Sequence, residues 1–260
     1  MDPDLVQASL EGFPNVKAVS ITHCDTSTGV LNDVAAVCDV VRRHGVLAMV
    51  DGVSSVGGVP FHFDAWQADI AVTATQKCLM CSPGLSFVAL SDRAWNSYER
   101  ATVVRNYWDF GAVREALDAD IPETPGTAPV HLVLQVRAAL DLMLEERLDN
   151  VFVRHEAMAR NVRDWAESRG LLLQCSQLRE FSPTLTGIAT PLGVDPQQIR
   201  QKMRDRGILI ARGIGPYRDS AVRIGHMGDI RLSDVERTLA ALGDVLTELH
   251  TEPAVAVSAD

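Results

Sequence analysis

The sequence has 260 residues, enough to fold around one or two substantial hydrophobic cores. Its content of 47% hydrophobic and 22% charged residues is that of a globular protein and excludes a disordered chain. A formal net charge of -10 disfavours binding to nucleic acids and to anionic membrane surfaces, because both carry the same sign of charge. We therefore expect a small-molecule ligand.

The first residues are acidic and lack the apolar run of a secretory signal or a membrane span, which predicts a cytoplasmic location. The five cysteines are odd in number and unevenly spread, unlike a secreted disulfide framework. Cys78 and Cys81 have the spacing of a metal-binding pair, but no further ligands stand at a matched spacing. We expect these two side chains to serve packing, with no metal bound.

Short apolar runs alternate with amphipathic stretches through the first half of the chain. Strands are predicted at residues 17–22, 46–50, 70–74 and 85–90, and a helix at 33–44. The runs are nearly continuous in Val, Ile, Ala and Leu, as in strands covered on both faces. This half predicts an α/β fold with a mostly parallel sheet and helices on both faces.

The pattern weakens over residues 92–129, where several prolines predict a functional loop. Long helices are predicted at 130–148 and 151–169, with a break near 149–150. A second α/β unit follows, with strands at 170–174, 184–190, 207–210 and 221–224 and helices at 195–206 and 233–249. We predict a large domain over residues 1–146, a small domain over 147–252 and a flexible tail over 253–260.

Polar clusters follow three of the predicted strands, at residues 23–29, 51–58 and 73–77. Ligands bind beyond the carboxyl ends of the strands in an open parallel sheet. If the strands are neighbours, the three clusters face one cavity. An acid and a lysine at neighbouring strand ends could also form an ordinary ion pair.

The order of the motifs decides between these interpretations. The chain contains, in sequence, THCDTSTG, VDGVSSVGG, TQK, a PG turn, ARGIG and RIGHMG. Over essentially its entire length it resembles the class V aminotransferases of the type I fold of pyridoxal 5′-phosphate (PLP) enzymes. That group contains the alanine–glyoxylate, serine–glyoxylate and pyridoxamine–pyruvate transaminases. The resemblance implies a PLP-dependent aminotransferase that acts on a small amino acid or amine with a 2-oxo acid as acceptor.

The resemblance also implies roles for individual residues. Lys77 corresponds to the lysine that binds the cofactor covalently and moves protons, and Asp51 to the acid that keeps the pyridine nitrogen protonated. Thr26 corresponds to a hydroxyl near the ring oxygen, and Gln76 to the amide beside the lysine. Arg223 corresponds to the arginine that grips the substrate α-carboxylate through two parallel donors.

Structural alternatives stand beside these roles. Asp51 could cap a turn and Lys77 could lie on the surface. Thr26 could bond its local backbone. Arg223 could be an ordinary surface or ion-paired arginine. His23 is expected either near the cofactor ring or packed in the core.

Thr124 resembles the threonine that reaches across the family dimer to the cofactor phosphate of the neighbouring subunit. The sequence departs from the family here, because Ile121 and Pro122 stand where an aromatic residue is common.

Family members have an extensive N-terminal region before the segment that matches residues 17–29, whereas this chain opens almost directly with that segment. The resemblance places in that region the phosphate-binding turn and the aromatic residue that stacks on the ring. We therefore expect the lysine-bearing part of a split or truncated enzyme. It is expected to act as a homodimer, or as a heteromer with a chain that supplies the missing region.

Two alternative functions remain. A lyase or cysteine desulfurase of the same fold would need a mobile catalytic cysteine, and Cys175 is the only loop candidate. A noncatalytic subunit that requires a partner chain is the other alternative, because the phosphate-binding turn has no convincing replacement in the sequence.

Overall fold

The computed structural model describes residues 1–175 and 180–251, so the predicted tail lies outside the described residues. The first sheet contains, in spatial order, β1 (Ala18–Thr22), β2 (Leu47–Asp51), β3 (Ile70–Ala74) and β4 (Ser86–Leu90). β1, β2 and β3 run parallel, and β4 pairs antiparallel with β3. The expected α/β fold with a mostly parallel sheet is confirmed.

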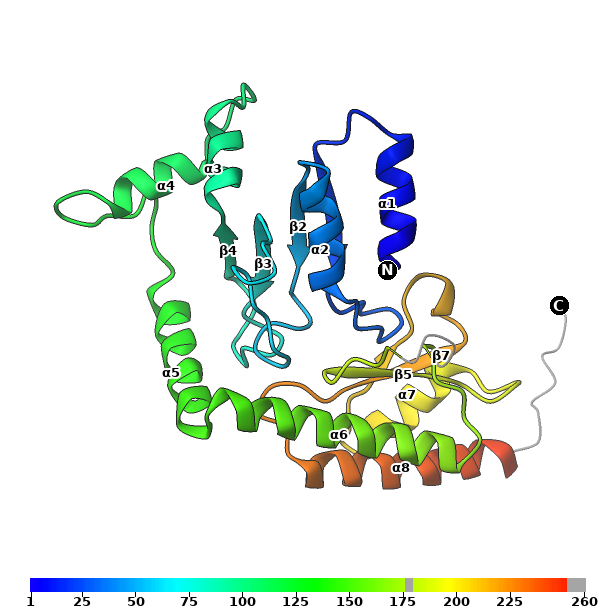
Figure 1. Ribbon diagram of the computed structural model, residues 1–260. Helices are drawn as coiled ribbons and strands as arrows, with labels where there is room; N and C mark the ends of the chain where they lie inside the picture. The colour runs from blue at the N-terminus through cyan, green and yellow to red at the C-terminus, as the bar shows by residue number, and fades with distance from the viewer. Residues whose placement is uncertain (176–179, 252–260) are drawn as a thin grey trace, which may run out of the picture.

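The helices α1 (Pro3–Gly12) and α2 (Val34–Arg43) cover one face of this sheet (Figure 1). The Asp33 side chain caps α2 by accepting a hydrogen bond from the backbone N–H of Ala36 at 3.0 Å. The apolar side of α2 packs on the alternate strand residues that face it, such as Val50. On the opposite face Met49 is 38% exposed, so that face is the more open one.

Two short helices correct the expectation of a long loop over residues 92–129. These are α3 (Asp92–Glu99) and α4 (Phe110–Leu117), which project away from the sheet (Figure 1). Each begins after a capping side chain, Ser91 for α3 and Asp109 for α4. These two capping residues indicate helix starts in the sequence, although the apolar pattern after them is too short to predict a helix.

A long helical pair links the first sheet to the second. α5 (Val130–Glu146) ends at Arg147, whose φ of 71° breaks the helix, and α6 (Leu148–Ser168) begins directly after it. The break therefore comes earlier than predicted. α6 lies beside α8 (Leu232–Thr251), as Figure 1 shows.

The second sheet is antiparallel and has its own core. Its spatial order is β5 (Leu185–Ala189), β7 (Ala221–Gly225) and β6 (Ala211–Arg212), with α7 (Pro196–Asp205) and the short helix η1 (Gly215–Tyr217) in the same unit. Buried apolar side chains of α6, α7 and α8 pack against it, including Met158, Ile199 and Leu242.

Two predicted strands of this unit are wrong. Residues 170–174 form only an isolated bridge through Leu173 to β5, and the pairing predicted at 207–210 begins at Ala211 instead. No helix built from residues 1–175 and 180–251 has both the length and the apolar character needed to cross a membrane.

Candidate active site

The turn after β3 carries Lys77 and is fixed by its own backbone. The N–H of Cys81 donates to the carbonyl oxygen of Thr75 at 2.9 Å, and the N–H of Met80 donates to that of Lys77 at 3.0 Å. Met80 has a φ of 60°, a conformation that few residues other than glycine adopt. Lys77 is partly buried, and its Nζ donates to Ser54 Oγ at 3.4 Å.

Ser54 joins the three polar clusters that the sequence placed at strand ends. Its Oγ lies 2.6 Å from Thr26 Oγ1 and also accepts the bond from Lys77. The loops after β1, β2 and β3 therefore meet at one point, as predicted. Ser54 itself was not predicted, because nothing in the sequence distinguishes it from Ser55, whose hydroxyl donates to the Gly52 carbonyl oxygen instead.

Asp51 ends β2 and lies at the same edge of the sheet as Lys77. It pairs with Val72 of β3, and Lys77 follows five residues further along the chain. Its Oδ1 accepts a hydrogen bond from the N–H of Val53 at 2.9 Å. This contact agrees with the alternative role of Asp51 as a residue that caps a turn. It also fixes the direction of the partly buried carboxylate.

Arg223 connects the second sheet to this cluster. From β7 its Nη1 donates to the carbonyl oxygen of Thr26 at 2.8 Å, and its Nε donates to that of Arg212 at 2.8 Å. Burial lowers the pKa of Arg223, but a guanidinium stays protonated at neutral pH. These bonds use two of its five N–H donors and hold the group beside the Lys77 cluster.

His23 follows β1 and packs in an aromatic cluster. Its ring centroid lies 5.6 Å from that of Phe61 and 5.5 Å from that of Trp66, and the residue is 4% exposed. Burial lowers the pKa of His23 to about 4, so the ring is neutral at pH 7. Its Nδ1 has no hydrogen-bond partner among the described residues. His23 is therefore packed in the core, which is one of its two expected environments. Its contact with the cofactor ring stays a prediction.

Gln76 and Thr124 do not contribute to the hydrogen bonds that join Lys77, Ser54 and Thr26. Both are exposed, and the Thr124 hydroxyl donates to the carbonyl oxygen of Gly126 at 2.7 Å, within its own loop. Their predicted contacts with a cofactor stay predictions.

Cys175 does not have the properties that a desulfurase nucleophile needs. It is 4% exposed, and burial raises the pKa of its thiol to about 11. A catalytic cysteine needs an accessible, low-pKa thiolate. Cys175 therefore does not support the alternative of a cysteine desulfurase.

The donors at this sheet edge fit the ring end of PLP. They comprise the Lys77 amine for the aldehyde carbon, the Asp51 carboxylate for the ring nitrogen and hydroxyls for the ring oxygen. Donors for the phosphate are expected from other segments. Among residues 1–175 and 180–251, no three His, Cys, Asp or Glu side chains gather as a metal site would require.

The family model described as Aminotransferase class-V matches residues 1–233. The chain belongs to this family. The class-V chain is 37% identical to the "Soluble hydrogenase, small subunit" of Synechococcus sp., over 96% of this chain and 65% of that protein. It is 34% identical to the pyridoxamine–pyruvate transaminase of Mesorhizobium japonicum, over 88% of this chain and 58% of that protein.

The crystal structure of pyridoxamine–pyruvate aminotransferase from Mesorhizobium loti matches this class-V chain with a TM-score of 0.91 at 32% identity. The match covers 98% of this chain and 66% of that one. These findings confirm the resemblance and the expected type I PLP fold. They also show that the chain spans about two thirds of the length of such proteins.

Proposed function

We propose that this chain is the lysine-bearing part of a PLP-dependent aminotransferase that moves an amino group between a small amino acid or amine and a 2-oxo acid. The observation that supports the proposal most strongly is the cluster of Lys77, Ser54 and Thr26 beyond three parallel strand ends. Arg223 reaches the same cluster from the second sheet.

When bound, PLP supplies an electron sink for the carbon–hydrogen bond that is broken at the substrate α carbon. Lys77 would hold the cofactor and then carry the proton on Nζ. The hydroxyl of Ser54 directs that amine, and Thr26 fixes the hydroxyl in turn. Asp51 would keep a proton on the ring nitrogen, which strengthens the sink.

Arg223 would orient the substrate. Two of its N–H groups are held by backbone carbonyl oxygens, so the guanidinium cannot swing away from the cluster. A planar guanidinium binds a carboxylate through two parallel hydrogen bonds, which fixes the direction of the α carbon–hydrogen bond. A carboxylated amino donor or acceptor is therefore proposed.

One relative is named as a hydrogenase subunit and another as a transaminase. We propose the transfer of an amino group for this chain. Lys77, Asp51 and Arg223 all have a role in that chemistry, whereas the hydrogenase name of the Synechococcus relative assigns none to them. A cytoplasmic location, predicted from the sequence, belongs to the same proposal.

A second chain completes the proposed enzyme, either an identical copy or a chain that supplies the part the relatives have in addition. The chain spans 65% of its Synechococcus relative. It also leaves apolar side chains of α5 uncovered, with Leu134 63% and Leu144 64% exposed. Such faces are usually covered by protein.

The covalent role of Lys77 can be tested directly, because the chain has only three lysines, at positions 17, 77 and 202. PLP is added to the protein, alone and with a candidate complementary chain, and borohydride reduction and peptide mapping follow. We expect the pyridoxyl group on Lys77, lost in Lys77→Arg and retained in the exposed control Lys17→Arg. Labelling in proportion to exposure, with Lys17 foremost, would contradict the proposal and favour a noncatalytic subunit.

A further inference from the structure

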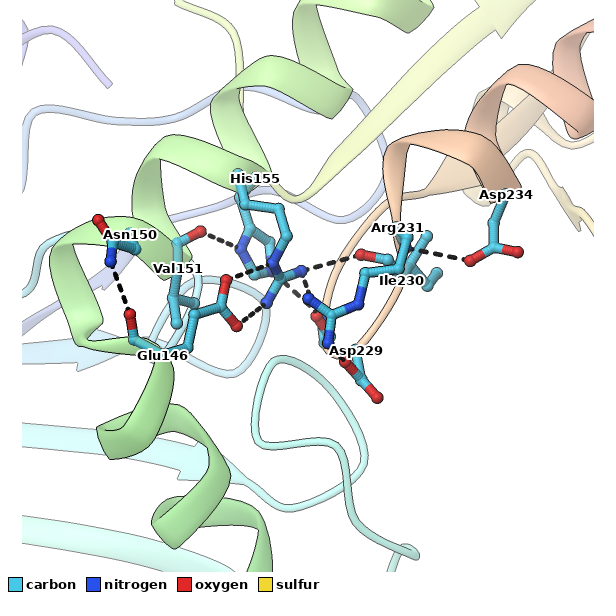
Figure 2. A network of polar contacts seen from close by, with 10 residues as sticks. Glu146, Asn150, Val151, His155, Asp229, Ile230, Arg231 and Asp234 are labelled. Atoms are coloured by element: carbon cyan, nitrogen blue, oxygen red, sulfur yellow. Dashed lines mark hydrogen bonds and ion pairs between the residues drawn. The ribbon is translucent and has the colours of Figure 1, made fainter.

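Arg154 of α6 links the break between α5 and α6 to the loop after β7. Figure 2 shows Glu146, at the end of α5, close to Ile230 of that loop. The Nε and Nη2 of Arg154 donate to the two carboxylate oxygens of Glu146 at 2.6 and 2.9 Å. Its Nη1 donates to the carbonyl oxygens of Gly228 and Ile230 at 2.8 and 2.9 Å. Only 15% of the Arg154 side chain is exposed, so these bonds are shielded from water and give Arg154 a defined position.

The next residue, His155, accepts a hydrogen bond from the backbone N–H of Gly228. Figure 2 shows His155 beside Val151 of the same helix. His155 is fully buried, with Nδ1 2.7 Å from the carbonyl oxygen of Val151 and Nε2 3.1 Å from the N–H of Gly228. A carbonyl oxygen only accepts and a backbone N–H only donates. The ring must therefore carry its proton on Nδ1 and leave Nε2 bare.

The charges around His155 are compatible with this neutral form. Burial lowers the pKa of His155 and the charge of Arg154 lowers it further, while the hydrogen bond to Val151 and the charge of Glu146 of α5 raise it. His226, on the loop that leads to Gly228, is a second buried histidine, and burial also lowers its pKa, to about 3. Protonation of Nε2 would remove the acceptor for the Gly228 N–H.

Gly228 transmits this grip to the lysine turn. Its φ is 79°, and a Cβ at this position would lie 3.2 Å from Met80 Cγ and 3.7 Å from the carbonyl oxygen of Lys77. Gly228 is therefore wedged between α6 and the turn, and both of its backbone polar groups are held from the α6 side. The same loop leaves β7, which carries Arg223.

We propose that Arg154 and His155 are positioning residues, which clasp Gly228 and thereby hold the Lys77 turn and the end of β7 in one fixed relation. The catalytic meaning of this clasp rests on the proposed function, because it matters to chemistry only if Lys77 acts on the cofactor. The clasp itself can be measured without any cofactor.

The first experiment uses the ¹⁵N-labelled full-length chain. Long-range ¹H–¹⁵N correlation should show His155 protonated on Nδ1 only. His155→Leu should speed amide hydrogen exchange at Gly228 roughly tenfold, as expected for loss of one buried hydrogen bond. His155→Gln offers an acceptor again and should restore most of the protection, and the exposed control His131→Leu should leave it unchanged. An Nε2 proton, or equal exchange in His155→Leu and wild type, would overturn the clasp.

The second experiment tests whether the clasp positions Lys77, with formaldehyde and borohydride methylation of the chain without PLP. In His155→Leu and Arg154→Lys, Lys77 should be methylated roughly threefold faster or more, because a loosened turn exposes its amine. Lysine cannot replace the guanidinium fork at position 154. Lys17 in the same molecules is the internal control, and His155→Gln should restore the slow rate.

An unchanged Lys77 rate in folded variants would refute the positioning role. Failure of PLP to label wild-type Lys77 would instead count against the proposed function and leave the methylation result valid, so the two failures can be told apart.

Discussion

Asp69 lies at the amino end of β3, 1% exposed, and holds several elements through one carboxylate. Its Oδ2 accepts hydrogen bonds from the N–H of Ala48 at 2.9 Å and from Arg93 Nη1 at 3.3 Å. Its Oδ1 accepts one from Ser91 Oγ at 2.8 Å. These bonds fix β2, β3 and the start of α3 relative to one another.

Asp69→Ala should lower the free energy of unfolding by about 3 kcal/mol, because it leaves the partly buried Arg93, the Ser91 hydroxyl and the backbone N–H of Ala48 without their acceptor. Urea unfolding measures the loss. Asp39→Ala is the matched control, since Asp39 pairs with Arg43 at the surface and should cost less than about 0.5 kcal/mol. Equal losses in the two variants would show that Asp69 does not organise the sheet.

At the residue scale, the order of the sequence motifs indicated which side chains lie near one another. Lys77, Thr26 and Arg223 were expected at one place and are brought together there, although their roles toward a cofactor stay predictions. Ser54 and Asp69 were missed, because their importance depends on which side of a loop or strand end meets a distant partner. That information lies in the tertiary packing.

At the scale of elements, Gly58 lies where the unit of the first sheet packs against the unit of the second. It lies in the loop after β2, and a Cβ there would come within 2.6 Å of Thr184 Cγ2 and 2.8 Å of Cys78 Sγ. Thr184 precedes β5, and its hydroxyl donates to the carbonyl oxygen of Ser54 at 2.6 Å. The two units can therefore pack this closely because residue 58 is a glycine and has no side chain.

Gly58→Ala should destabilise the chain by about 2 kcal/mol, because both neighbours would have to move in a packed interior. Gly12→Ala is the control, since nothing lies within 4 Å of its Cβ position at the end of α1. Thermal unfolding should show a lower midpoint only for the first variant. An unchanged midpoint in Gly58→Ala would mean that the contact between the two units has more room than its geometry indicates.

Prediction at the element scale followed the strength of the apolar pattern. β1, β2, β3, β5 and β7 lie in mostly apolar stretches of sequence and were found, as were the long helices. α3 and α4 escaped because they are short and have few buried side chains. Residues 170–174 form two backbone hydrogen bonds with β5, through Leu172 and Gln174, but no continuing ladder.

At the scale of the whole molecule, buried neutral histidines make stability depend on pH. Burial lowers the pKa of His226 to about 3, whereas an unfolded histidine protonates near 6.5. Between these values the unfolded chain binds more protons, so stability is complete above pH 6.5 and falls as the pH decreases.

His226→Gln should flatten the decline of the unfolding free energy between pH 6.5 and 5 by up to about 1.4 kcal/mol per pH unit. Urea unfolding at several pH values gives the slope. The exposed His44→Gln is the control and should leave the slope as it is. A slope that is the same in wild type and His226→Gln would indicate that His226 is charged in the folded chain.

The uncovered apolar side of α5 should make the isolated chain self-associate. Replacing Leu134 and Leu144 together by lysine should lower the sedimentation coefficient measured at high concentration, because both side chains are more than half exposed. Leu192→Lys, at an exposed position of the second unit and not on α5, should not change it. A chain that is monomeric before any substitution would contradict the expectation.

Thr22, Asp51 and Val72 are register partners on neighbouring strands. This register matters for correct folding of the sheet. Side chains alternate along β2, so a shift by a single position would turn Asp51 inward beneath Val37 and Val41 of α2. Burying an unpaired carboxylate among them would cost several kcal/mol. Asp51, the proposed catalytic acid, therefore also disfavours a sheet in which β2 is shifted by one residue. An apolar residue at position 51 would remove this penalty as well as the proposed catalytic role.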